Sequence, residues 1–421
     1  MTEQVFLIGA ATAAHQVEGN NIYSDCWRME HLKHSAFKEP SDDAVDHYNR
    51  YEEDIRLLAE AGANAYRFSI EWARIEPEEG KFSEQELRHY EAVIDCCARY
   101  GLTPVVTLHH FSSPAWLIRR GGWGKEYVVS AFARYARFVT QRLGSKLPYI
   151  CTINEANMGY QLGKIAADMS KASKKEGGVQ VGVELDMKKL LLGMLEQGLA
   201  FRVNPFGINS FLSPRTQQQE LFVMQAHRAA VEAIREVSPS SRVGLTLSLF
   251  DYQSEPGGEE TAARLWQEDF GFYLPYFRDD DFLGVQNYSR KLVNPDGSHD
   301  AEHRPVTQMG YEDYPAALGH VLRTVARDYG GDLIVTENGI ATADDSRRCE
   351  FIREAFRGVR ACVADGLPVK GYFYWSLLDN FEWQAGYDKT FGLIAVDRHT
   401  HTRSPKKSLQ VLGELAKETF V

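Results

Sequence analysis

The sequence predicts an α/β protein, a (β/α)8 or TIM barrel, formed by a single domain over residues 1–421. Short apolar runs alternate with amphipathic segments along the whole chain, the runs number eight, and none leads into the Gly-rich turn of a dinucleotide-binding sheet. An open, doubly wound sheet is the alternative, which the count of eight disfavours. The predicted strands are, in order, Val5–Gly9, Ala63–Ser69, Thr103–Leu108, Pro148–Ile153, Arg242–Ser248, Phe282–Asn287, Leu333–Thr336 and Val369–Trp375.

The segments between these runs repeat apolar residues at helical spacing. Helices are predicted, for example, at Ala44–Ala61, Glu84–Tyr100, Lys125–Leu143, Gln218–Val237, Glu260–Phe272 and Asp345–Ala364. Two segments break the alternation and are predicted as long loops, Leu162–Arg215 after the fourth strand and Arg290–Asp313 after the sixth. Because both follow strands, we expect both at the carboxyl-terminal face, where barrel enzymes build their sites.

Composition narrows the function classes. The 421 residues are 44% hydrophobic, enough for a large core, and carry a formal charge of −11 with a pI near 5.7. This acidity disfavours nucleic acid and anionic membranes as partners but not a neutral small molecule. The six cysteines have no metal-binding spacing, so we expect free thiols and a cytoplasmic location. The apolar start Val5–Ala14 lacks a signal peptide's basic leader, and no run reaches the length of a membrane span.

Polar and aromatic residues gather where the predicted strands end. In strand order they are Gln16, Arg67, His109 and His110, Asn154 and Glu155, Tyr288, Glu337 and Asn338, and Trp375. The segment after the eighth strand adds Asp379, Glu382, Trp383 and Phe391. In a closed parallel barrel all of these positions lie around one mouth.

Two glutamates, Glu155 and Glu337, would therefore face each other across that mouth. Paired carboxylates suit glycoside hydrolysis, in which one attacks the anomeric carbon and the other protonates the leaving oxygen. Tryptophan rings suit the C–H faces of a sugar, and Gln, Asn and His side chains supply directional hydrogen bonds to neutral hydroxyls. The pattern thus favours a sugar-cleaving site.

Each residue also has a structural explanation when taken alone. A glutamate at a strand end can cap a helix or pair with a base, Arg67 can form a plain buried ion pair, and Trp375 can be core. Adjacent strand residues face opposite ways, so His109 and His110 are more typical of one core and one surface histidine than of a metal pair. Only the convergence of all these positions on one face favours a site.

Six segments carry motifs in a specific order: "FLIGAATAAHQVEGN", "YRFSIEWARIEPEEGKF", "VVTLHHFSSPAWL", "TINEAN", "IVTENGI" and "WSLLDNFEWQAGYDKTFGL". Together they resemble glycoside hydrolase family 1, the β-glucosidase and β-galactosidase family. The match runs from Phe6 to about the last helix and leaves out the two long loops. Any one motif would be weak, but their number and order make the resemblance specific.

The resemblance implies a role for each motif residue. Glu337 matches the nucleophile, Glu155 the general acid/base, and Arg67 and Tyr288 the pair that orients the nucleophile. Arg67 would keep Glu337 ionised, and the neighbouring charge would raise the pKa of Glu155 so that it begins protonated. The matching sugar contacts are Asn154 for the 2-hydroxyl, Gln16, His110, Glu382 and Trp383 for the other hydroxyls, Trp375 as stacking platform, Phe391 as apolar wall and Tyr311 on the leaving-group side.

The chain departs from the family pattern at several positions. Ala156 stands where Pro is common, Phe111 and Ser112 where Trp and Asp are common, Gln286 where Asn is usual, and Thr390 where Arg is frequent. The preferred sugar and the leaving group therefore stay open.

The sequence predicts a retaining β-glycosidase, first a β-glucosidase, with β-galactosidase activity or broad specificity open. The resemblance implies no cofactor and no metal. A 6-phospho-β-glycosidase is an alternative that Glu382 disfavours, since a carboxylate repels phosphate. An inactive sugar-binding barrel is another, but both glutamates are present. A metal-dependent barrel using His109 and His110 would need ligands from several strands. The sequence leaves the oligomeric state open and does not exclude a homo-oligomer.

Overall fold

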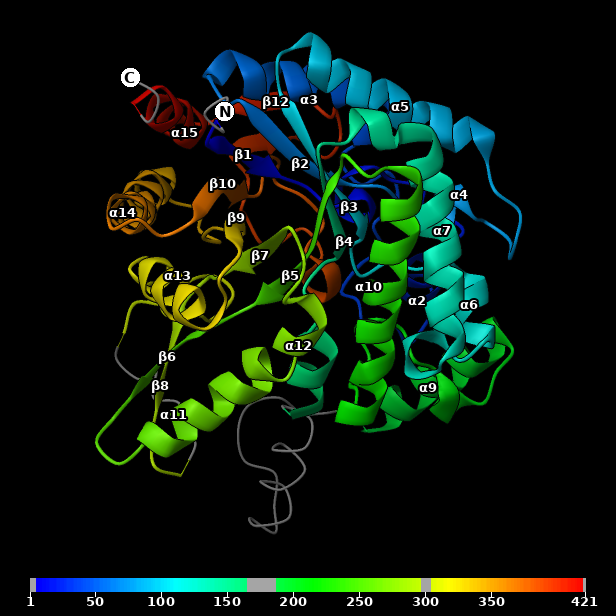
Figure 1. Cartoon of the computed structure of the whole chain (residues 1–421). Helices are drawn as coiled ribbons and strands as arrows, with labels where there is room; N and C mark the ends of the chain where they lie inside the picture. The colour runs from blue at the N-terminus through cyan, green and yellow to red at the C-terminus, as the bar shows by residue number, and fades with distance from the viewer. Residues whose placement is uncertain (1–4, 165–186, 297–303, 419–421) are drawn as a thin grey trace.

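A computed structural model describes residues 5–164, 187–296 and 304–418, and its centre is a closed barrel of eight parallel strands (Figure 1). Around the ring the strands follow the order β1, β10, β9, β7, β5, β4, β3, β2. Their bounds are β1 Leu7–Ala11, β2 Ala65–Ser69, β3 Thr103–His109, β4 Tyr149–Ile153, β5 Arg242–Ser248, β7 Phe282–Gln286, β9 Asp332–Asn338 and β10 Val369–Trp375. The predicted TIM-barrel fold class is therefore confirmed.

Both faces of the strands are buried because both alternating sets of residues are mainly apolar. One set, from seven of the eight strands, fills the barrel interior: Leu7, Ala65, Val105, Tyr149, Phe282, Ile334 and Phe373. The neighbouring residues in each strand belong to the larger core under the helices. Gly9 is required where β1 meets β2, because a Cβ there would lie 1.9 Å from the carbonyl oxygen of Ala65.

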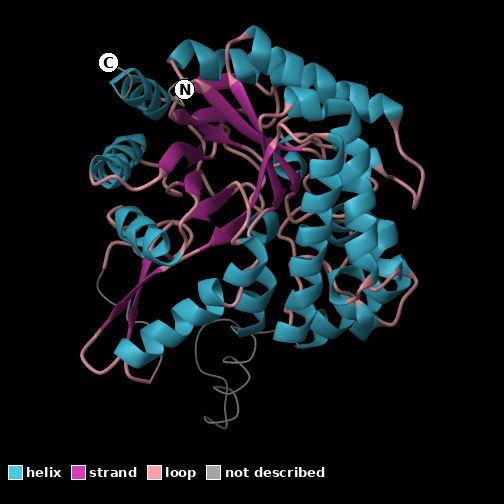
Figure 2. Cartoon of the chain, in the orientation of Figure 1, coloured by secondary structure: helices cyan, strands magenta, loops and turns pink. Residues whose placement is uncertain are grey.

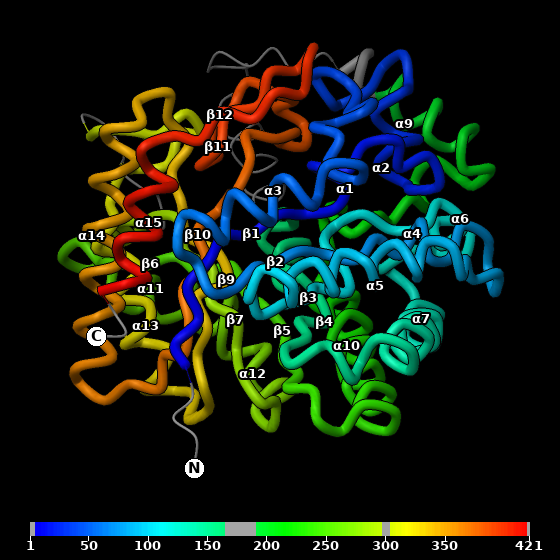
Figure 3. Tube along the Cα trace, turned by 90° about the horizontal axis from the view of Figure 1, so that it is seen from above, coloured from blue at the N-terminus to red at the C-terminus, as the bar shows by residue number. Residues whose placement is uncertain are grey.

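Helices cover the outside of the barrel (Figure 2). Their bounds are α1 Ala14–Val17, α2 Asp25–Glu30, α3 His47–Ala61, α4 Trp72–Ile75, α5 Glu84–Arg99, α6 Ala115–Arg119, α7 Tyr127–Leu143, α9 Met187–Phe201, α10 Gln217–Val237, α11 Glu259–Trp266, α12 Leu274–Phe277, α13 Ala317–Asp328, α14 Asp345–Ala364 and α15 Lys407–Glu418. Ser83 caps α5, and Thr216 caps α10 in a capping box with Gln219. Seen from above, α15 lies alongside α14 and near β1 (Figure 3).

The structure corrects the expected bounds of several elements: β2, for example, begins at Ala65 rather than Ala63, and α3 at His47 rather than Ala44. β1 begins and ends two residues later than predicted. β9 extends two residues beyond the predicted end, so Glu337 lies within the strand rather than after it. The helix predicted at Glu260–Phe272 ends at Trp266 and continues as a π turn, Gln267–Gly271.

The two predicted long loops contain regular elements. The first includes α9, which packs against α2 and α6, while its residues 165–186 lie outside the described part of the chain. The second begins with β8, Arg290–Val293, which pairs with β6, Asp251–Ser254; its residues 297–303 are likewise outside the description. A further pair, β11 Ile394–Val396 and β12 Arg403–Pro405, follows β10.

All six cysteines are buried free thiols, as the sequence predicts. Within the residues that the structure describes, there is no helix with the length and apolar character needed to cross a membrane.

Candidate active site

A cavity of about 430 Å³ opens at the carboxyl ends of the barrel strands. Of the residues to which the resemblance gives a role, the structure brings all but Arg67 and Asn154 together in its lining. Of the other positions predicted around the mouth, His109, Asn338 and Asp379 do not line it. The predicted residues that do are Gln16, His110, Glu155, Tyr288, Tyr311, Glu337, Trp375, Glu382, Trp383 and Phe391. Arg67 and Asn154 are fully buried and contact each other, with Arg67 also bonded to Glu337.

Glu337, near the end of β9, is held by three donors that lie on or just after other barrel strands. Arg67 Nη1 donates to Oε1 at 2.6 Å, Gln286 Nε2 to the same oxygen at 2.9 Å, and the Tyr288 hydroxyl to Oε2 at 2.5 Å. Arg67 comes from β2, Gln286 ends β7, and Tyr288 follows it. Because all three hydrogen bonds favour the charged form, they hold Glu337 as an oriented carboxylate.

The side-chain oxygen of Asn154 accepts hydrogen bonds from residues that also bond to the two glutamates. Its Oδ1 accepts hydrogen bonds from Arg67 Nη2 at 2.6 Å, Gln286 Nε2 at 2.7 Å and Thr246 Oγ1 at 3.2 Å. With the carbonyl oxygen occupied by these donors, the amide nitrogen points the other way, 3.2 Å from His110 Nε2. The orientation of the Asn154 amide is therefore fixed by its neighbours.

Glu155 follows β4 in a different environment. Its backbone lies in the left-handed region at φ 42°, which is uncommon for a residue other than glycine. The backbone N–H donates to Thr246 Oγ1 at 2.8 Å, and the next N–H, of Ala156, donates to the Thr246 carbonyl at 3.0 Å. The turn after β4 is thus fixed to β5, and it directs a buried carboxyl group into the cavity.

The two glutamates differ in proton affinity. Burial and the negative charge of Glu337 raise the pKa of Glu155 well above its usual range, only partly opposed by a hydrogen bond from Ser248. Burial also raises the pKa of Glu337, but Arg67 and the Tyr288 hydroxyl oppose it. A proton shared by this pair therefore resides on Glu155, and Glu337 is the carboxylate.

The opposite wall, formed by residues after β1 and β10, carries polar groups for a neutral ligand. Gln16 Nε2 donates to the Phe381 carbonyl at 2.7 Å and to Glu382 Oε2 at 3.2 Å. Burial, followed by the charge of Glu337, raises the pKa of Glu382 to about 8. Within the described residues, the buried atoms Gln16 Oε1 and His110 Nδ1 have no hydrogen-bond partner. Sugar hydroxyls would supply what these two atoms lack.

The two adjacent histidines have separate environments. His110 lies against Trp375, with ring centroids 5.5 Å apart and nearly parallel, and burial lowers its pKa so that the ring is neutral. His109 points away, bonds to Ser113 at 2.9 Å and packs on Trp123. Both are buried, so the expectation of one surface histidine is wrong, because Trp123 and Phe211 pack on His109 and Trp375 lies against His110. In the described part of the chain no three His, Cys, Asp or Glu side chains are grouped to hold a metal.

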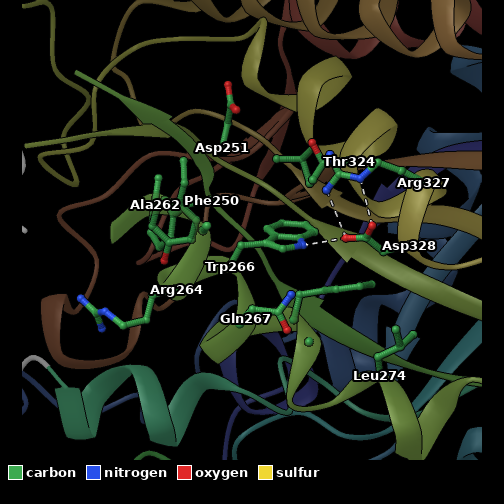
Figure 4. Close-up of a pocket in the computed structure, with 15 residues that line it drawn as sticks. Phe250, Asp251, Ala262, Arg264, Trp266, Gln267, Leu274, Thr324, Arg327 and Asp328 are labelled. Atoms are coloured by element: carbon green, nitrogen blue, oxygen red, sulfur yellow. Dashed lines mark hydrogen bonds and ion pairs between the residues drawn. The ribbon is translucent and has the colours of Figure 1, made fainter. Parts of the chain in front are cut away.

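A second, larger cavity of about 750 Å³ lies between α11 and α13 (Figure 4). Its charged residues are engaged with neighbours: Arg327 pairs with Asp328, Arg264 with Glu268, and Asp251 with His320. The Trp266 indole N–H donates to Asp328 at 2.9 Å, as the figure shows. None of the predicted site residues lines this cavity, so we do not assign the active site to it, although it is the larger of the two.

Sequence reasoning missed Gln286 and Thr246 as parts of the site. Both lie at inward positions near the ends of their strands, where a polar residue in an apolar run is the available signal. The sequence identified Gln286 only as a departure from a family pattern. The structure shows that it contacts both Glu337 and Asn154.

Comparisons with known proteins agree with this geometry. Residues 2–180 and 286–420 match the model of glycosyl hydrolase family 1. The chain is 30% identical to a 1,4-β-D-glucan glucohydrolase of Thermotoga neapolitana, over 96% of this chain and 95% of that protein. The crystal structure of the β-glycosidase BGL167 is 45% identical, with a TM-score of 0.90 and coverage of 99% of this chain and 97% of that one. A Thermotoga maritima β-glucosidase in complex with cyclophellitol is 27% identical, with a TM-score of 0.81 and coverage of 100% and 99%.

Proposed function

The chain belongs to glycosyl hydrolase family 1 and is a β-glycosidase, and we propose that it is a retaining β-glucosidase in which Glu337 is the nucleophile and Glu155 the general acid/base. β-Galactosides are the second sugar class in the proposal. The support for glucose is the naming of relatives such as the Thermotoga maritima β-glucosidase A, which is 29% identical over 96% of this chain.

In the first step, Glu337 attacks the anomeric carbon while the bond to the leaving oxygen breaks. Glu155 transfers its proton to that oxygen, and the alcohol departs from a covalent glycosyl-enzyme. Esterification removes the charge of Glu337, so one cause of the raised Glu155 pKa disappears and Glu155 becomes a base. Glu155 then takes a proton from water while that water attacks the anomeric carbon, and the bond to Glu337 breaks. The sugar leaves with the configuration at its anomeric carbon retained.

The other site residues position the sugar and the nucleophile. Arg67, Tyr288 and Gln286 hold Glu337 through the three hydrogen bonds described above. Asn154 is proposed to contact the 2-hydroxyl. For the remaining contacts we propose Gln16, His110, Glu382 and Trp383 at the other hydroxyls, Trp375 beneath the ring, Phe391 as a wall, and Tyr311 towards the leaving group.

The observation that carries this assignment is the unequal hydrogen bonding of two buried glutamates on one cavity. Glu337 accepts from a guanidinium, a phenol and an amide, whereas burial and a neighbouring charge favour a proton on Glu155. One group is thus an ionised nucleophile and the other an acid, as double displacement requires.

Azide rescue tests the two roles against each other. In Glu337→Gly, hydrolysis of 4-nitrophenyl β-glucoside is expected to be lost by roughly 10⁵-fold or more, and azide should restore turnover as the α-glucosyl azide, because it attacks opposite the leaving group. In Glu155→Ala, azide should instead replace water at the glucosyl-enzyme and give the β-glucosyl azide. NMR distinguishes the α-glucosyl azide from the β-glucosyl azide. The β-azide from Glu337→Gly and the α-azide from Glu155→Ala would mean that each glutamate has the role proposed for the other.

The 6-phospho-β-glycosidase alternative is disfavoured by the polar wall. Glu382 lies in the cavity beside Gln16, where a carboxylate would repel phosphate. The nearby Lys389 donates to the Gln308 carbonyl at 2.8 Å. Comparing the hydrolysis of 4-nitrophenyl β-glucoside with that of its 6-phosphate tests this point. Faster turnover of the 6-phosphate would favour the 6-phospho-β-glycosidase alternative over the β-glucosidase.

We also propose that the chain acts as one catalytic domain in the cytoplasm without a cofactor, in line with its free cysteines. Sedimentation of the whole chain decides between a monomer and a homo-oligomer.

A further inference from the structure

The cavity has two chemically different sides. Its polar residues Gln16, Glu382 and Trp383 follow β1 and β10. In the ring of eight strands, β5 lies opposite β1 and β4 lies opposite β10. The side opposite the polar groups is therefore built by the segments after β4 and β5, with the segment after β7 beside them.

That second side is lined mainly by apolar side chains. They are Met158 and Leu162 after β4, Leu212 further along, Leu249 and Phe250 after β5, and Met309 and Tyr311 after β7. Except for buried Leu249 and more exposed Tyr311, these residues are half-buried, so apolar surface faces the cavity. Polar groups on this side include the Ser248 hydroxyl, which hydrogen-bonds to Glu155, and the Tyr311 hydroxyl.

The apolar side is held in place by buried contacts. Arg215 links the segments that carry Met158 and Leu212. Its backbone N–H donates to the Gly159 carbonyl at 2.9 Å, and its guanidinium donates to the Phe211 carbonyl and pairs with Glu220 at 2.7 Å. The guanidinium occupies the space beside Gly159, where a Cβ would lie 2.1 Å from it. Phe250 is fixed by the Lys291 ammonium, 3.8 Å from its ring centre, and by the edge of Tyr311. A preformed apolar wall binds an apolar group without first having to be ordered.

Glu155 belongs to the apolar side, since Met158 follows it by three residues in the same turn. The leaving oxygen must lie within reach of its acid, and the group attached to that oxygen then lies along the apolar side chains. A second sugar there would leave several hydroxyls without partners, whereas an alkyl chain or aromatic ring would replace water on apolar surface.

From this geometry we infer that the leaving-group side selects apolar aglycones, alkyl alcohols and phenols, over a second sugar. The inference rests on the proposed function, because Glu155 must be the acid for this side to hold the leaving group. The chemistry is unchanged: the proton of Glu155 goes to the glycosidic oxygen, which departs as the alcohol or phenol.

The test compares kcat/KM for hexyl β-glucoside and cellobiose, with methyl β-glucoside as the small alkyl reference. The hexyl glycoside is expected to exceed cellobiose at least tenfold, and to exceed the methyl glycoside by about twofold to fourfold per methylene until the wall is covered. Equal or faster cleavage of cellobiose overturns the inference. In that case 4-nitrophenyl β-glucoside is still hydrolysed, whereas failure of the proposed function abolishes its turnover as well.

Polar substitutions on the wall provide the second measurement. In Phe250→Ser and in Leu212→Asn, the ratio of kcat/KM for hexyl β-glucoside to kcat/KM for cellobiose should fall at least threefold. Hydrolysis of β-glucosyl fluoride reports on the sugar side alone, because its leaving group is a single ion. Leu199→Asn is the matched control, because this leucine is 80% exposed on α9 and does not line the cavity. An unchanged ratio in both folded wall variants overturns the assignment of selectivity to this wall.

Discussion

The ends of β9 and β4 present the same residue type to the same cavity in opposite chemical settings. Glu337 in β9 accepts three side-chain hydrogen bonds, all from residues on or just after other barrel strands. Glu155 after β4 is fixed through its backbone, and its carboxyl group is buried beside an anion. The two pKa values differ because of the surroundings of each carboxyl group, since the residue type is the same.

Asn154 and Gln286 connect these two regions. Gln286 Nε2 lies within hydrogen-bonding distance of Glu337, Asn154 and Thr246, and Thr246 accepts from the Glu155 backbone. One buried hydrogen-bond network therefore maintains the different surroundings of Glu337 and Glu155. Single substitutions in this network should change catalysis to different extents.

After the loss expected in Glu337→Gly, the largest effect comes from Glu155→Ala on a substrate with a poor leaving group. Loss of general acid catalysis should slow cleavage of hexyl β-glucoside by about 10²–10⁴-fold. The first step on a 2,4-dinitrophenyl glucoside should change far less, because that phenolate departs without a proton. Pre-steady-state and steady-state rates on both substrates check this, and equal losses would argue against Glu155 as the acid.

Arg67→Met should have the next largest effect. It removes the guanidinium from Glu337 and Asn154, so kcat should fall about 10²–10³-fold. Stability should also fall by about 3–5 kcal/mol because a buried charge loses its partner. Rates are therefore measured below the melting transition seen by circular dichroism. Arg327→Met, at the second cavity, is the control. Normal kcat in folded Arg67→Met would contradict the positioning role.

Gln286→Leu should lower kcat/KM by about tenfold, since hydrogen bonds to both Glu337 and Asn154 disappear while the volume is retained. Gln286→Asn keeps the amide and should recover part of the loss. Gln267→Leu, on the rim of the larger cavity, is the matched control. The same loss in the Leu and Asn variants would indicate that packing, not hydrogen bonding, sets the effect.

The smallest effect is a shift in the titration of Glu155. In Glu337→Gln the anion that raises the Glu155 pKa is gone, so that pKa should fall, while remaining above the usual value because burial is the larger cause. The protonated acid should therefore be lost at lower pH than in the parent protein. Carboxyl ¹³C NMR follows this directly. Glu382→Gln should lower the same pKa less, and a rise in either variant would contradict the electrostatic coupling.

Sequence reasoning predicted most of the fold because each strand is a short apolar run with its own local signal. β5 and β10 coincide with their predicted bounds, and α14 matches at both ends. The last two residues of β9 were missed because Glu337 and Asn338 are polar, and polar residues after an apolar run are typical of a loop. The buried position of His109 was likewise undetermined, since its ring packs against Trp123 and also against Phe211, which lies far along the chain.

The sequence by itself determined the barrel, the two glutamates and the family, because strand periodicity and ordered motifs are local properties of the chain. Only the tertiary structure decided which groups surround each glutamate, how Gln286 lies between Glu337 and Asn154, and that the side beside Glu155 is apolar. Those properties depend on distances between side chains from different strands. Closure of the barrel fixes these distances, and no single segment encodes them.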